Sequence, residues 1–84
     1  MKMQIEKFSR SSYVGHTDKY TVLAEVLKKP SQKGIDRGRV VALLVLNQSD
    51  GKIIAKYDHG WKERADTSHE DMIRQLVLEL ERQV

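Results

Sequence analysis

The side chains that could do chemistry in this sequence are few, and their spacing does not assemble a reaction centre. Three histidines, His16, His59 and His69, show none of the short spacings typical of metal ligands. Asp58 and His59 are adjacent, but neighbouring residues of a strand point to opposite faces of a sheet, so the carboxylate would not orient the imidazole as a general base. The sequence therefore predicts no catalytic residue, no metal and no cofactor, and a protein that is not an enzyme.

A second group of chemically useful side chains is a run of cations in residues 28–39. Its members are Lys28, Lys29, Lys33, Arg37 and Arg39, with Asp36 as the one acidic residue among them. Flexible cations of this kind contact the phosphates of nucleic acids without reading sequence. Gly34 and Gly38 do not make a phosphate loop here, because no Lys-Ser/Thr pair and no helix follow them. The run predicts either a nucleic-acid contact or a solvated basic loop.

Composition bounds what can position these residues. The chain has 84 residues and a net charge of +3, with 39% hydrophobic and 32% charged residues, which is typical of one globular domain spanning 1–84. It has no cysteine, which excludes disulfides and thiolate metal sites. Its first residues lack the apolar core of a signal peptide, and its longest apolar run, Val40 to Leu46, is too short for a membrane span. We therefore expect a soluble cytoplasmic protein with no membrane partner.

The apolar pattern predicts a small antiparallel sheet. Residues 19–28 alternate in the manner of a strand that must end before Pro30. Residues 39–47 are rich in valine and leucine without alternation, and a turn at 48–51 leads to a partner strand at 52–58. Residues 3–8 are a candidate edge strand, and Tyr13-Val14 a short extended piece. Three or four strands are expected.

The faces of the predicted hairpin follow from its register. If Asn47 pairs with Lys52, the side chains of Ala42, Leu44 and Leu46 share a face with those of Ile53, Ala55 and Tyr57. That face is wholly apolar and is expected to receive a helix. The reverse face would carry Leu43, Val45, Ile54 and Lys56, with Arg39 diagonally opposite Asp58. Being half apolar, it should be covered by the N-terminal segment, a second copy of the chain or a partner.

The C-terminal segment has the strongest local signal in the sequence. Thr67 followed by Glu70 fits a capping box that starts a helix. One helical stripe then contains Met72, Ile73, Leu76, Val77, Leu80 and Val84, and Leu78 falls on the opposite side. The predicted fold is thus α+β: a three- or four-stranded antiparallel sheet with one C-terminal helix packed on one face.

Two glycine-containing segments resemble a known family. They are Ser31-x-x-Gly34-Ile35-x-x-Gly38-Arg39-Val40 and, after Leu43, Tyr57-Asp58-x-Gly60-Trp61. The pattern resembles a family of short uncharacterised proteins carried mainly by phages, prophages and plasmids of Gram-positive bacteria. The similarity covers about residues 20–62; relatives often have Arg at position 59 and Lys at position 42. It implies a mobile-element origin, a source in which inhibitors of host defence, anti-CRISPR proteins among them, and nucleic-acid-binding regulators are common.

These observations favour a small binding protein, and two functions remain open. The first is an inhibitor of a host defence nuclease that binds a protein partner through Leu43, Val45, Ile54, Lys56 and the 34–39 loop. The second is a nucleic-acid-binding regulator that uses Lys28, Lys29, Lys33, Arg37 and Arg39. A homodimer or a tight hetero-complex is a further expectation, because Leu78 and the half-apolar sheet face both leave apolar surface to cover.

Overall fold

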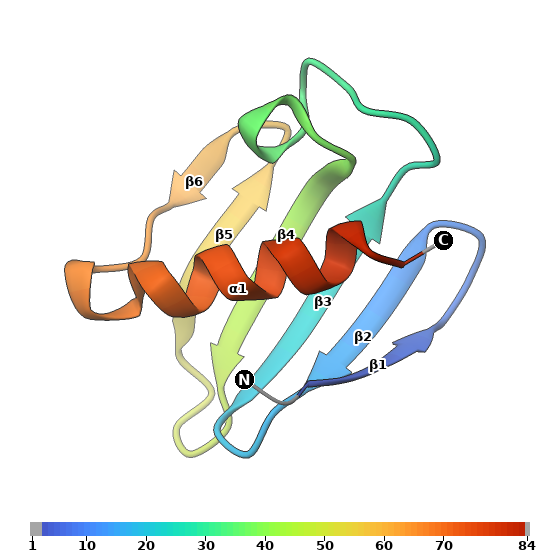
Figure 1. The fold of residues 1–84 in the computed structure, drawn as a ribbon. Coiled ribbons are helices and arrows are strands. Elements are labelled where there is room, and N and C mark those ends of the chain that lie inside the picture. The colour runs from blue at the N-terminus through green and yellow to red at the C-terminus, as the bar shows by residue number, and fades with distance from the viewer. Residues whose placement is uncertain (1–2, 84) are drawn as a thin grey trace.

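The computed structural model describes residues 3–83 as one antiparallel sheet with a C-terminal helix (Figure 1). Its elements are β1 (Gln4–Lys7), β2 (Ser12–His16), β3 (Tyr20–Val26), a 3₁₀ turn (Ile35–Arg37), β4 (Val40–Asn47), β5 (Ile53–Asp58), β6 (Trp61–Glu63), a second 3₁₀ turn (Thr67–His69) and α1 (Glu70–Glu81). Each strand pairs with its neighbour in sequence, in the order β1 to β6. No helix in this part of the chain is long and apolar enough to cross a membrane.

The α+β class and the C-terminal helix are confirmed, but the expected number of strands is wrong. The sheet has six strands rather than three or four. The candidate pieces at the N-terminus are both strands, and β6 follows β5 through a tight turn at His59 and Gly60. Strands of three to five residues are too short for alternation to show in sequence, and their pairing with longer neighbours decides their conformation.

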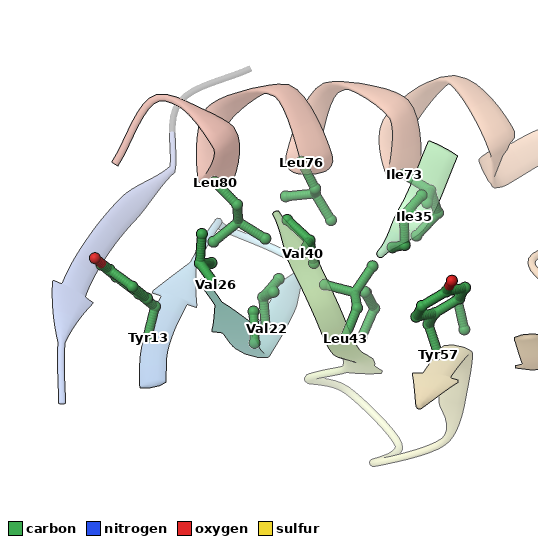
Figure 2. Packing of buried hydrophobic residues seen from close by; sticks show 13 residues of the cluster. Tyr13, Val22, Val26, Ile35, Val40, Leu43, Tyr57, Ile73, Leu76 and Leu80 are labelled. Carbon is green, nitrogen blue, oxygen red and sulfur yellow. The ribbon is translucent and has the colours of Figure 1, made fainter. Parts of the chain in front are cut away.

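The core lies between α1 and one face of the sheet. Figure 2 shows Leu76 and Leu80 pointing from the helix toward the strands, and both are fully buried. The strands contribute the inward-facing side chains Val22, Ala24, Val26, Leu43, Val45, Ala55 and Tyr57. The predicted stripe is confirmed for Ile73, Leu76 and Leu80, with Met72 and Val77 partly buried. Leu78 is 57% exposed, as its position outside the stripe predicts; Val84 lies outside the described residues.

A β-bulge overturns the predicted faces of the β4–β5 hairpin. The predicted register holds next to the turn, where Leu46 lies opposite Ile53 and the Asn47 N–H donates to the Lys52 carbonyl at 2.9 Å. The register then shifts by one residue, so Ala55 lies opposite Val45 and Tyr57 opposite Leu43. The helix packs on this face, and the expectation that it would cover Ala42 and Leu44 is wrong.

The bulge matches the apolar face of β5 to that of β4. The register with β3 puts Leu43 and Val45 on the core face, and without the bulge the charged residues of β5 would share that face. A bulge inserts one extra residue into one strand and so moves every later side chain of that strand to the other face. Here it places Lys56 opposite Leu44 and Asp58 opposite Ala42, on the face away from α1. Both charges remain exposed. The helix-facing side receives Ala55 and Tyr57 instead, which avoids the cost of burying unpaired charges.

The start of the helical segment differs from the predicted capping box. The N-cap of the 3₁₀ turn that precedes α1 is Asp66, whose carboxylate accepts from the His69 N–H at 3.2 Å and from Ser68 Oγ at 2.7 Å. Residues Thr67–His69 form a 3₁₀ turn that leads into α1 at Glu70. Thr67 therefore does not cap the helix, and Glu70 is its first residue. Aspartate is preferred slightly over threonine as an N-cap, so the helical segment begins one residue earlier than the capping box predicts.

We expect the Asp66 cap to make stability depend on pH. Hydrogen bonds from Ser68 and then His69 lower the pKa of the Asp66 carboxyl below 3.8. A lowered folded-state pKa contributes stability above the unfolded value, and the contribution is lost as pH falls through the folded pKa. Asp66→Ala should lower the urea midpoint at pH 7, and the difference from wild type should shrink as pH falls below about 3.8. Thr67→Ala is the matched control; a larger loss for it at pH 7 would contradict this cap.

Candidate binding surface

The face of the sheet away from α1 is left uncovered by every element of residues 3–83. At its centre Val14 lies beside Leu23 and Leu23 beside Leu44, one on each of three adjacent strands. Leu46 and Ile53 form a second apolar pair nearer the β4–β5 turn. We call this surface the open face. Leu23 and Ile53 are each 43% exposed, so large aliphatic side chains reach solvent on it.

A shallow hollow of about 540 Å³ lies on the open face. Its walls include Leu23, Leu44 and Ala42 from the central strands, with Lys56 and Asp58 on one side. Phe8, in the turn between β1 and β2, lines the hollow on the other side and is 77% exposed. The N-terminal segment was one expected cover for a half-apolar face, but β1 instead extends the edge of the sheet beside β2.

Charged side chains surround the apolar centre. The register places Glu6 beside Val14 and Glu25 beside Ala42. On the other side, Asp58 also lies beside Ala42, and Glu63 lies beside Lys56. These four carboxylates and Lys56 are exposed. Protein–protein interfaces in general combine an apolar centre with a polar rim.

The structure separates the residues predicted to share a partner-binding face. Leu43 and Val45 are 1% and 0% exposed beneath α1, so the prediction that they contact a partner is wrong. Ile54, at the bulge, is half-buried and packs against the core. Lys56 alone of these four lies on the open face and lines the hollow. The bulge accounts for all four positions, because it exchanges the faces of β5 relative to β4.

Four of the five cations predicted for the basic loop, residues 28–39, are free to contact a partner, and the fifth, Arg39, is not. The side chains of Lys28, Lys29, Lys33 and Arg37 are exposed. Arg39 instead contacts the C-terminal end of α1: its Nη2 donates to the Glu81 carbonyl at 2.8 Å and to the Gln83 carbonyl, and its Nε lies 3.4 Å from the Glu81 carboxylate. The Arg39 N–H also donates to the Glu81 carboxylate at 2.8 Å. The predicted pairing of Arg39 with Asp58 is therefore wrong, and Arg39 holds the helix onto the loop.

The glycine-containing segments serve the scaffold. A Cβ on Gly34 would lie 2.0 Å from the Gly38 carbonyl oxygen, so the loop closes on itself at a distance that only glycine permits. Tyr57 donates its hydroxyl hydrogen to the Lys33 carbonyl at 2.8 Å and meets the Trp61 ring edge-on at 5.1 Å. Together these contacts fix the loop against the end of the sheet.

The Asp58–His59 pair is closer than expected. His59 has a φ of 57°, which turns its ring back so that Nδ1 lies 2.8 Å from the Asp58 carboxylate. The hydrogen bond with His59 lowers the pKa of the Asp58 carboxyl. Both side chains are more than half exposed at the end of β5. Within residues 3–83, no group of three His, Cys, Asp or Glu side chains is placed to hold a metal ion.

A family model described as "Domain of unknown function (DUF7678)" matches residues 11–81. The chain belongs to this family. The matched region of the DUF7678 domain begins just before β2 and ends with the last residue of α1, so it includes the central strands of the open face, the basic loop and the helix. β1, with Glu6, and Phe8 lie before the match. No match was found among curated proteins or among solved structures.

The sequence indicates only some of the residues that form the open face. The residues that alternate with the core positions of β3 are Thr21, Leu23, Glu25 and Leu27. Two of these four are leucines, which indicates that this side of the strand is not a purely solvent-exposed surface. Phe8 and Val14 carried no such signal, because their segments are short. Ala42 and Leu44 were assigned to the core, because the bulge at Ile54 was not foreseen.

Proposed function

We propose that this chain is a small, non-enzymatic binding protein whose open face docks a protein partner. The observation that carries the proposal is the uncovered apolar centre of a sheet whose other face already holds the only α-helix of residues 3–83. Large contiguous apolar patches are uncommon on the surface of monomeric proteins, and they often belong to interaction sites. The hollow is a concave site on this face in which one large side chain of a partner could be buried.

The resemblance to phage- and plasmid-borne proteins supplies a partner class. On that basis the chain is a mobile-element protein that acts in the cytoplasm of a bacterial host and inhibits a defence nuclease in the manner of an anti-CRISPR protein. Such an inhibitor needs no catalytic residues, since it acts by occupying a surface that the nuclease requires for its activity. The support for this partner is the motif similarity, whereas the support for the docking face is its exposed apolar surface.

A pull-down with matched surface variants tests the docking face. Wild-type protein, Leu23→Asp and Leu78→Asp are immobilised separately, and each is incubated with the same nuclease-treated lysate of a bacterial host. Both leucines are exposed, on the open face and on α1 respectively, so each variant should fold. A stoichiometric protein partner should be retained by wild type and by Leu78→Asp, with affinity for Leu23→Asp reduced at least tenfold. A partner that binds Leu23→Asp unchanged would overturn the proposal.

Nucleic-acid binding is the second candidate, and the four exposed cations of the basic loop favour it. If Lys28, Lys29, Lys33 and Arg37 each neutralise one phosphate, the log–log slope of affinity against salt on duplex DNA should approach about −3.6. Lys28→Glu with Lys29→Glu should then abolish binding, whereas Leu23→Asp should not affect it. Partners that are lost on nuclease treatment, together with this slope, would replace the protein-docking proposal.

A further inference from the structure

The charges around the open face indicate the chemistry of the partner that binds there. We propose that the segment that docks there is basic: an apolar stretch of a protein chain flanked by lysine or arginine side chains. This inference rests on the proposed function of the open face and adds the chemistry of the partner. A basic segment meets carboxylates at the rim and aliphatic side chains at the centre, so both parts of the surface are complemented.

The sign of the charge on the open face is opposite to that of the chain. The chain as a whole has a net charge of +3. The charged strand residues that the register pairs on the open face are four carboxylates, Glu6, Glu25, Asp58 and Glu63, and the ammonium group of Lys56. Lys62, at the β5–β6 register shift, adds a second cation near Asp58, so the carboxylates still outnumber the cations. Negative charge is thus concentrated around the apolar centre of the open face, while the basic loop residues lie beyond the strand ends.

These carboxylates are available to a partner. Within residues 3–83, Glu6, Glu25 and Glu63 take part in no ion pair. Glu25 accepts one hydrogen bond, from Ser11 Oγ at 3.3 Å, which leaves its second oxygen free. Asp58 is the exception, because one of its carboxylate oxygens already lies 2.8 Å from His59 Nδ1. Docking a basic segment would replace water around these groups with opposite charge, and docking an acidic one would add repulsion.

The same charges argue against the other occupants of the face. A second copy of the chain, placed face to face across a two-fold axis, would bring one acidic rim against another. The phosphates of a nucleic acid would meet the same repulsion. The expected homodimer and the nucleic-acid alternative therefore do not use this face, whereas a basic protein segment fits both its apolar centre and its rim.

A displayed library of random peptides tests the inference without knowledge of the natural partner. The library is selected on immobilised wild-type protein in low salt, and bound peptides are counted only if soluble wild-type protein competes them off and Leu23→Asp protein does not. We expect the surviving sequences to combine aliphatic or aromatic residues with an excess of lysine and arginine. Replacing those cations by glutamate in a synthetic peptide should weaken binding at least tenfold.

A charge-reversed variant provides the control. Glu25→Lys with Glu63→Lys reverses two rim charges that make no ion pair in residues 3–83, so the fold should persist. Selection on this variant should lose the excess of lysine and arginine. Asp18→Lys with Asp71→Lys changes the total charge equally at exposed sites that the register does not place on the open face, and should leave the selection unchanged.

The outcomes separate this inference from the proposed function. Peptides that require Leu23 but show no excess of cations would overturn the basic-partner inference and leave the docking face in place. Peptides that bind Leu23→Asp protein as well as wild type, or the recovery of no peptide at all, would overturn both. Concentration-dependent dimerisation abolished by Leu23→Asp would assign the face to a second copy and also overturn the inference.

Discussion

Leu43→Asp is expected to prevent the protein from folding, whereas Leu44→Asp should leave it folded. Leu43 is 1% exposed beneath α1, and an aspartate there would bury an unpaired charge. The expected loss is about 5 kcal/mol or more, comparable to the whole stability of a small domain. Leu44 is the next residue of the same strand and lies on the open face, where its replacement would meet solvent.

The measurement is a pair of urea melts followed by circular dichroism, with the dispersion of amide signals in NMR spectra as the test of folding. Both variants carry the same substitution one position apart, so strand propensity and charge are matched. Leu44→Asp should also lose the protein partner, whereas Leu78→Asp should not. If Leu43→Asp folds and Leu44→Asp does not, the bulge at Ile54 is absent and the helix covers the other face.

Gly34→Ala is expected to produce the second large loss of stability. A Cβ at this position would lie 2.0 Å from the Gly38 carbonyl oxygen, and a backbone atom cannot move aside as a flexible side chain can. The loop would have to open, and opening it disturbs the hydrogen bond from Tyr57 to Lys33 and the Arg39 contacts to Glu81. We expect a destabilisation of roughly 1–3 kcal/mol, the usual range for forced overpacking.

Gly60→Ala is the control for this substitution. A Cβ on Gly60 would meet no atom within 4 Å, so the same change of residue type adds no clash there. Thermal melts of the two variants should differ by several degrees, with Gly60→Ala near wild type. Equal melting temperatures would show that the Gly34–Gly38 loop opens at no cost and does not hold the helix.

The elements that could be predicted from sequence are those with local causes. The helix was predicted because its apolar stripe repeats within the element itself, and the turn at 48–51 because Asp50 and Gly51 favour it. The β4–β5 bulge was not predictable in the same way, because it depends on the cost of placing Lys56 and Asp58 under a helix that lies elsewhere in the chain. One inserted residue then reversed the faces assigned to Leu43 and Leu44.

The candidate site was predicted in part for the same reason. Lys56 was placed correctly on a face without a helix, whereas Leu43 and Val45 were assigned to the wrong side. Arg39 was grouped with the exposed cations because its partner, Glu81, is 42 residues away in sequence. A side chain whose role depends on a distant partner gives no periodic signal, and only the folded chain shows that it is engaged.

The strand order has a consequence for how the molecule forms. Each strand pairs with the next one along the chain, and every connection except the one between β3 and β4, residues 27–39, is short, so the sheet requires little long-range search. Contacts between α1 and the strands span a greater length of chain and cost more entropy to close. We therefore expect the helix to dock late, onto strands already in register. The Arg39–Glu81 contact joins the last turn of α1 to the start of β4, so we expect it to form at this late step and its loss to speed the exposure of the sheet face beneath α1.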